Sequence, residues 1–192
     1  MQKPYIKKHS EVSGFTVWIV NGEYVRKNIN PDFNHIGEHE VFSFIPKNEF
    51  WIDRYSGKGE EEFYIPHLLL ENELMRKGKS YVYAVEKAYK LQYNLRRKIF
   101  SKKKLNKLSK DKKYLIKKIK KKLLNYSGKR IKVYLVDGDL VRTFFHAGFI
   151  AGGHDKVYKF ISKNEIWLDN RILPNERELV LLHEVIERNL MD

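Results

Sequence analysis

The sequence contains no cysteine, which excludes disulfide bonds and thiolate metal ligands from this chain of 192 residues. No run of about 18 apolar residues occurs, so no segment predicts a helix that crosses a bilayer. The first residues, Met1–Lys8, have no apolar stretch of the kind that a signal peptide carries. We therefore expect a cytoplasmic protein without a membrane span, in the host cytoplasm if the gene is viral. A hydrophobic content of 42% is enough for a packed core.

Acidic residues are nearly absent from one stretch of the chain. Residues 76–130 hold 22 Lys or Arg against only Glu86 and Asp111, a net charge of +20, whereas the rest of the chain has a net charge of −6. The overall charge of +14 therefore comes from a single segment. Such an asymmetry predicts separate roles for the basic segment and for the two mildly acidic parts that flank it.

Two segments of the chain are alike. Residues 17–76 align with residues 133–192 without a gap, at a constant offset of 116, and 21 of the 60 positions are identical. The agreement includes a segment ending in Trp51-Ile52-Asp53, which matches Trp167-Leu168-Asp169. Unrelated segments would share only a few positions, so we interpret the pair as a duplication of one structural unit.

Each copy has the patterns of two hairpins followed by a helix. The dipeptides Asn21-Gly22 and Asp137-Gly138 stand between runs rich in β-formers and predict two-residue hairpin turns. A second hairpin is predicted in each copy from Val41–Ile45 with Glu49–Asp53 and from Val157–Ile161 with Glu165–Asp169. The closing helix is predicted over Leu179–Met191 in the second copy, and in the first it should start near Ile65 or kink there, because of Pro66.

The basic segment predicts two amphipathic helices, the first capped by Ser80 and the second spanning roughly Leu105–Tyr126. The predicted fold is α+β. It consists of two tandem ββββα units, residues 1–76 and 131–192, with a basic helical hairpin, residues 77–130, inserted between them.

One pair of side chains could carry chemistry. His183 and Glu187 are four residues apart on the predicted final helix, so they are neighbours on one face and could chelate a divalent cation such as zinc. His67 and Glu71 repeat the pair in the first copy. The alternative is a hydrogen-bonded pair in a partly polar core.

The run Ile166-Trp-Leu-Asp169, followed by Leu181-Leu-His-Glu-Val-Ile-Glu187, resembles the core of small zincin-type metallopeptidases, in which a strand leads into a helix bearing His-Glu-x-x-His. It is also similar to proteins of phages and other mobile elements that carry such a strand before such a helix. The resemblance implies a zinc site on His183 and Glu187 with Glu184 as the general base. Here Glu187 stands where the family has its second histidine.

A third ligand would have to come from another element. His154 is the first candidate, because Gly152-Gly153 before it allow a sharp turn and a close approach of the backbone. Its counterpart in the first copy is Glu38, which is also a candidate ligand. Leu68 stands where the second copy has Glu184, so a hydrolytic site is expected only in the second copy. The first copy would be a scaffold or a metal site without a base.

The basic segment suits a polyanion such as nucleic acid, because Lys and Arg contact phosphates and its six tyrosines could stack on unpaired bases. A protein partner, an acidic membrane surface or a solvated helical pair are the other candidates. Two functional hypotheses follow. One is a metal-dependent, peptidase-like hydrolase with a basic insert for polyanion binding. The other is a non-enzymatic phage or mobile-element binding protein whose basic hairpin engages nucleic acid or a protein partner, with the repeats as scaffold.

Overall fold

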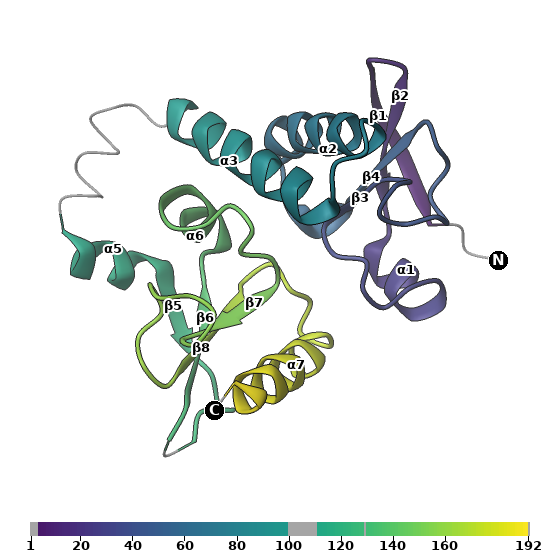
Figure 1. Ribbon diagram of the computed structural model, residues 1–192. Coiled ribbons are helices and arrows are strands. Elements are labelled where there is room, and N and C mark those ends of the chain that lie inside the picture. Colours follow the sequence, from purple (N-terminus) through teal and green to yellow (C-terminus); the bar gives the residue numbers. More distant parts are fainter. Residues whose placement is uncertain (1–3, 100–110, 129, 192) are drawn as a thin grey trace. The chain divides into compact units, whose positions relative to one another are not determined.

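The computed structural model describes residues 4–99, 111–128 and 130–191 and confirms the α+β class. The chain forms two compact units, the N-terminal unit Met1–Leu95 and the C-terminal unit Arg96–Asp192. Each contains a four-stranded sheet (Figure 1). Among the described residues, no helix has the length and apolarity that crossing a membrane requires.

In the N-terminal unit the sheet order is β1-β2-β4-β3, with β2 and β4 parallel and the outer pairs antiparallel. Helix α2 contacts β3 and β4 and packs on one face of the sheet. The elements are β1 (Tyr5–Val12), β2 (Phe15–Val20), α1 (Gly22–Asn28), β3 (Ile36–Gly37), β4 (Glu49–Asp53), η1 (Arg54–Ser56) and α2 (Glu61–Arg76), followed by α3 (Tyr81–Ile99).

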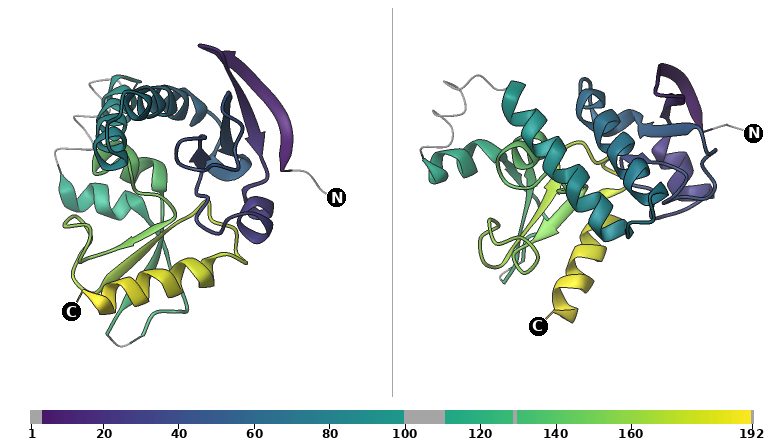
Figure 2. Two further views of the ribbon diagram at one scale, coloured as in Figure 1. Left: turned by 45° about the vertical axis from the view of Figure 1, so that its right-hand side comes forward. Right: turned by 45° about the horizontal axis from the view of Figure 1, so that its top comes forward.

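The C-terminal unit has the same sheet plan, with order β5-β6-β8-β7 and parallel β6 and β8. The registers also correspond, since Val133 pairs with Ile166 as Val17 pairs with Phe50. Helix α7 contacts β7 and β8 and runs across one face of this sheet (Figures 1 and 2). The elements are α5 (Lys112–Ile119), β5 (Lys120–Leu123), β6 (Lys132–Val136), α6 (Gly138–Phe144), β7 (Gly152–His154), β8 (Glu165–Asp169) and α7 (Arg177–Leu190).

The predicted hairpins at Asn21-Gly22 and Asp137-Gly138 are wrong, because each dipeptide starts a helix in the connection between two parallel strands. The Asn21 side chain accepts a hydrogen bond from the Tyr24 amide at 3.3 Å, and Asp137 accepts from Leu140 at 3.1 Å, so both residues are N-caps. The glycines are needed for close approach. A Cβ on Gly138 would lie 1.8 Å from an oxygen of Asp169.

The aspartates Asp53 and Asp169 end the central parallel strands, and their carboxylates anchor the first helix of each unit. Asp169 binds the Arg142 guanidinium at 2.7 Å, with both side chains fully buried, and Arg142 also donates to the Phe149 carbonyl. Asp53 and Arg26 form the same pair at 3.0 Å in the N-terminal unit. Burial of a charged pair is tolerated here because each partner has further hydrogen bonds.

The second predicted hairpin is also wrong, since Val41–Ile45 and Val157–Ile161 form turns rather than strands. The antiparallel partner of β4 is instead β3, and that of β8 is β7. The apolar residues of these turns fill the core on the tryptophan face of each sheet, where Ile45 packs with Trp51 and Ile161 with Trp167. Their hydrophobic pattern therefore reflects packing rather than strand pairing.

The prediction for the basic segment, residues 77–130, is wrong in its second half. Ser80 accepts from the Tyr83 amide and caps α3 as predicted. The helix predicted over 105–126, whose first residues lie outside the described part, ends at Ile119, and the chain continues as β5. Leu115 and Ile119 pack in the core of the C-terminal unit. Residues 77–130 are thus divided between the two units, and α2 starts at Glu61, before the predicted point.

Candidate metal centre in the C-terminal unit

Helix α7 turns one side toward the sheet, and this side bears both apolar and ionisable residues. Leu181 and Val185 pack against the apolar cluster that contains Ile166. Glu184 and Arg188 lie on the same side and are buried. A helix repeats every 3.6 residues, so these four positions fall on one face.

Strand β7 makes room for the acidic side chain because two of its residues have no side chain. A Cβ on Gly152 would lie 3.0 Å from Oε1 of Glu184. A Cβ on Gly153 would lie 2.6 Å from the ring of Tyr158. The two glycines therefore let a carboxylate and an aromatic ring approach the strand closely, as the sequence predicted for Gly152-Gly153.

His154 ends β7 and meets the acidic residues of α7. Its side chain is fully buried, and its Nε2 lies 3.2 Å from Oε2 of Glu187. Ligand atoms of His154, Glu184 and Glu187 all lie within 4.8 Å of one another. In the described ranges, this is the one group of three such residues close enough together to hold a metal ion. Three residues that the sequence singled out are thus brought together.

The hydrogen bonds of His154 indicate which tautomer its ring adopts. Nδ1 accepts from the Lys156 amide at 3.3 Å, so the ring proton resides on Nε2 and is donated to Glu187. A cation bound to Nε2 would displace the proton there, and the ring would then carry its proton on Nδ1. Nδ1 would then no longer accept the hydrogen bond from the Lys156 amide. Metal binding at Nε2 therefore requires a tautomer change and the loss of the hydrogen bond from the Lys156 amide.

The electrostatics of the centre favour an added positive charge. Burial and the neighbouring charge of Glu187 raise the pKa of Glu184 to about 7. Burial and the two glutamates also raise the pKa of Tyr158 to about 12. Two carboxylates held this close repel each other, and a divalent cation between them would remove the repulsion.

Two residues that the sequence analysis did not single out hold α7 against β7. Arg188 Nε donates to Asp155 at 2.6 Å, and Arg188 Nη2 donates to Asn164 at 3.0 Å. Burial opposes ionisation of Asp155, but hydrogen bonds from Arg188 and Asn164 outweigh it and hold its pKa below the ordinary value. Asp155 follows His154 and Arg188 follows Glu187, so this ion pair fixes the positions of both candidate ligands. In the sequence, only the position of these two residues next to candidate ligands could have drawn attention to them.

His183 does not join the centre, which corrects the predicted ligand pair of His183 and Glu187. It is exposed, and it lies on the side of α7 that also exposes Leu179, Leu182 and Ile186. The reason is helical phase. The apolar residues Leu181 and Val185 turn their side toward the sheet, and residue 183 falls on the opposite side.

The N-terminal unit has a different polar cluster at the corresponding place. His67 Nε2 lies 3.3 Å from Glu71 Oε2, both side chains are buried, and the ring of Tyr89 from α3 lies 5.0 Å from that of His67. Glu38 is fully buried, accepts from Asn72 at 2.6 Å, and has its pKa raised by burial. The predicted pair of His67 and Glu71 is thus formed, as a buried hydrogen-bonded pair.

Comparison with family models, curated proteins and solved structures found no match for this chain. The functional interpretation of the centre therefore depends on the chemistry of His154, Glu184 and Glu187.

Proposed function

We propose that the C-terminal unit binds one Zn²⁺ through His154, Glu184 and Glu187, and that the protein is a metal-dependent, peptidase-like hydrolase. The observation that carries the proposal is the convergence of one imidazole nitrogen and two carboxylates within 4.8 Å. Three protein ligands that leave further positions open are typical of catalytic rather than structural zinc sites.

The donor set fits zinc in kind and in spacing. Zinc binds imidazole nitrogen and carboxylate oxygen at about 2.0–2.2 Å, so two ligands of one ion lie at most about 4.3 Å apart. The observed group needs only small side-chain rotations to reach that spacing. Glu184 is buried beside another carboxylate, and a dication would compensate both charges.

The residues divide the work as follows. His154 and Glu187 present their ligand atoms from β7 and α7, and Arg188 with Asp155 holds these two elements together. Glu184, the general base that the resemblance implies, is in our proposal the third ligand. Its pKa near 7 lets it release its proton to solvent at neutral pH. The bound ion would supply Lewis acidity toward a water molecule or a substrate carbonyl.

Zinc binding is tested first, by isothermal titration calorimetry and by elemental analysis of dialysed protein. We expect one Zn²⁺ per chain in the unmodified protein and a loss of at least about tenfold in affinity in His154→Ala. His183→Ala is the matched control, because it removes an exposed histidine from the same helix that bears Glu184. Equal affinities in the two variants would contradict the proposed ligand set.

Hydrolysis is tested separately with fluorescently labelled casein. Turnover should require Zn²⁺, disappear with a chelator and be lost in Glu187→Gln, whereas His183→Ala should retain it. Zinc binding without any chelator-sensitive turnover would leave a metal-binding protein and contradict the hydrolase assignment.

A second function, polyanion binding by the basic segment, is supported by how α3 and α5 present their charges. Tyr83 with Lys87 and Tyr114 with Lys118 form exposed cation–π pairs at 5.1 and 5.5 Å. Exposed lysine and tyrosine side chains contact phosphates and unpaired bases. If zinc binding fails, we favour a non-enzymatic phage or mobile-element protein that binds nucleic acid or a protein partner in this way.

We also propose that the two units arose by tandem duplication. The gapless alignment of 21 identities and the equal strand orders support it. The ion pairs Arg26–Asp53 and Arg142–Asp169 occupy matching positions at the offset of 116 and support it further.

A further inference from the structure

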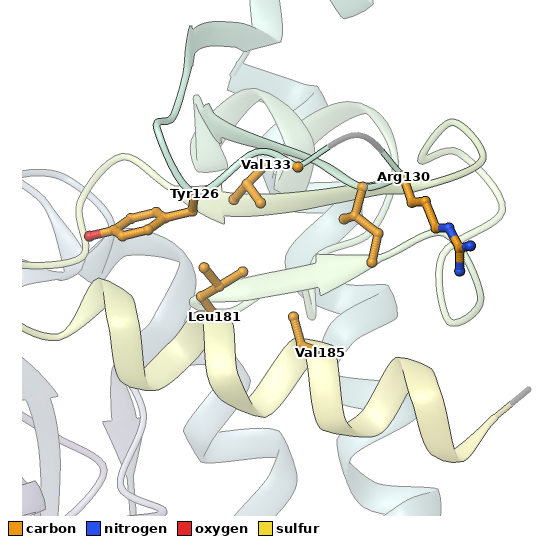
Figure 3. Close-up of a pocket in the computed structure, with 7 residues that line it drawn as sticks. Tyr126, Arg130, Val133, Leu181 and Val185 are labelled. Carbon is orange, nitrogen blue, oxygen red and sulfur yellow. The ribbon is translucent and has the colours of Figure 1, made fainter.

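A largely apolar groove lies between α7 and the chain that connects β5 to β6 (Figure 3). Its volume is about 360 Å³, and Leu181 and Val185 of α7 face the connecting chain across it. Tyr126 and Arg130 mark its two ends in the figure. The lining residues are Tyr126, Gly128, Arg130, Ile131, Val133, Leu181 and Val185.

The N-terminal unit shows what fills the matching space there. Phe15 stacks on Phe50 with ring centroids 4.2 Å apart, and it packs with Val17, Ile65 and Leu69 in one cluster. At the offset of 116, these five positions are occupied in the C-terminal unit by Ile131, Ile166, Val133, Leu181 and Val185. Four of these five line the groove, the exception being Ile166.

The groove therefore corresponds to a partly buried position beside the core, from which an aromatic ring is missing. Isoleucine replaces both stacked phenylalanines, at 131 and 166, and Val180 replaces Tyr64. The connection also differs, since a two-residue turn at Ser13 and Gly14 joins β1 to β2, whereas residues 124–131 join β5 to β6. The smaller side chains leave apolar surface accessible between the helix and this longer connection.

The charges around the groove favour an anionic group beside an aromatic ring that would bind there. Arg130 lines the groove, and Lys122 and Lys132 are exposed on the adjoining strands, whereas Lys121 there is paired with Asp137. Glu178 is an acidic group beside the groove, and it accepts a hydrogen bond from the Tyr126 hydroxyl at 3.3 Å. Arg130 presents five donors suited to a carboxylate.

We propose that this groove is a docking site for a partner protein, and that it takes an aromatic side chain from an acidic peptide segment. The ring would occupy the place that Phe15 fills in the N-terminal unit, and a neighbouring carboxylate would pair with Arg130. A volume of about 360 Å³ suits one aromatic side chain and its flanking backbone. A buried aromatic anchor within a charged rim is the usual arrangement of a binding hot spot.

This site is independent of the zinc centre. The groove lies at the β5–β6 side of the sheet, whereas His154 ends β7 at the opposite edge. Failure of either proposal therefore leaves the other intact, because zinc binding and peptide binding are measured separately and involve different residues.

The test is fluorescence anisotropy with a labelled peptide of sequence Asp-Glu-Phe-Glu-Asp and a second peptide in which Ala replaces Phe. We expect the Phe peptide to bind at least about tenfold more tightly, since an anchoring aromatic side chain contributes upward of 1.4 kcal/mol. Ile131→Phe, which copies the residue of the N-terminal unit, should fill the groove and remove that difference. Leu182→Phe adds a ring to the exposed side of α7 and is the matched control, with unchanged binding.

Equal binding of the two peptides would overturn the proposal, because it would show only attraction to the lysines. Unchanged binding in Ile131→Phe would overturn it as well. Should that variant not fold, methyl NMR of the unmodified protein gives the answer. Titration with the Phe peptide must shift the methyl signals of Leu181 and Val185, and their constancy would exclude the groove. Equally tight binding of phenylpropionate alone would indicate a small-molecule site and would also overturn the peptide assignment.

Discussion

Glu184 is the residue whose protonation should matter most to the C-terminal unit. Its pKa is about 7 in the folded protein against an ordinary value of 4.5, so between these values the folded state holds a proton that the unfolded state has lost. The associated stability is present at low pH and is lost as pH rises toward 7 and above, by up to about 3 kcal/mol at 1.36 kcal/mol per pKa unit.

We therefore predict that Glu184→Gln stabilises the ion-free protein increasingly as pH rises from about 5 to about 8. Urea unfolding of both proteins in a chelator measures the difference in unfolding free energy at each pH. Glu178→Gln removes an exposed carboxylate from the same helix and controls for the loss of charge. A difference between Glu184→Gln and the unmodified protein that does not change with pH would exclude the raised pKa.

The same carboxyl should make zinc affinity depend on pH. A cation that binds Glu184 must displace its proton, so below pH about 7 affinity should fall about tenfold per pH unit for that group alone. Above pH 7 the contribution of Glu184 should level off. Calorimetric titration at several pH values measures this slope, and an affinity that rises as pH falls would contradict the assignment.

Gly138 is a position in the C-terminal unit at which no side chain fits. Its lack of a side chain lets Asp169 reach the start of α6, and an added Cβ would lie 1.8 Å from the Asp169 carboxylate. We predict that Gly138→Ala destabilises the C-terminal unit by about 3 kcal/mol, as overpacking of a core does. Gly128→Ala meets no atom within 4 Å and is the control, with little change in denaturation midpoint.

At the scale of elements, the sequence predicts what depends on local chemistry. The strands Glu49–Asp53 and Glu165–Asp169 and the final helix are found as predicted, because short β-branched and aromatic runs and a capped amphipathic stretch define them locally. The dipeptide Asp137-Gly138 was misassigned because Asp-Gly suits both a hairpin turn and a helix start. Only the position of Asp169, 31 residues further on, decides between the two.

The candidate site could be predicted only in part for the same reason. His154 was found because the glycines before it indicate close approach. His183 was misplaced because the side of α7 that faces the sheet is set by tertiary packing of Leu181 and Val185. The pair of Asp155 and Arg188 joins residues 33 apart, and no local pattern indicates such a contact.

Helix α5 allows a direct test of polyanion binding at the element scale. Its lysines at 112, 113, 117 and 118 are all exposed. Replacing these four by Gln should weaken binding to a single-stranded oligonucleotide at least about tenfold at low salt, and the slope of log K against log salt should become shallower by about 3. An unchanged slope would show that α5 makes no phosphate contacts.

At the scale of the whole molecule, two units with one sheet plan carry different polar clusters. Glu38 and Leu68 of the N-terminal unit stand where the C-terminal unit has His154 and Glu184. The N-terminal cluster is a hydrogen-bonded arrangement of His67 with Glu71 and of Asn72 with Glu38. We predict one zinc ion per chain rather than two. Native mass spectrometry measures this count, and a second ion of equal affinity would mean that both clusters bind metal.

The central claim is that His154, Glu184 and Glu187 together hold a metal ion. The most direct measurement is anomalous diffraction at the zinc absorption edge from crystals grown with Zn²⁺. We expect one strong peak in the C-terminal unit, at about 2.1 Å from His154 Nε2 and within bonding distance of both carboxylates. Absence of a peak there, or a peak at His183 instead, would contradict it.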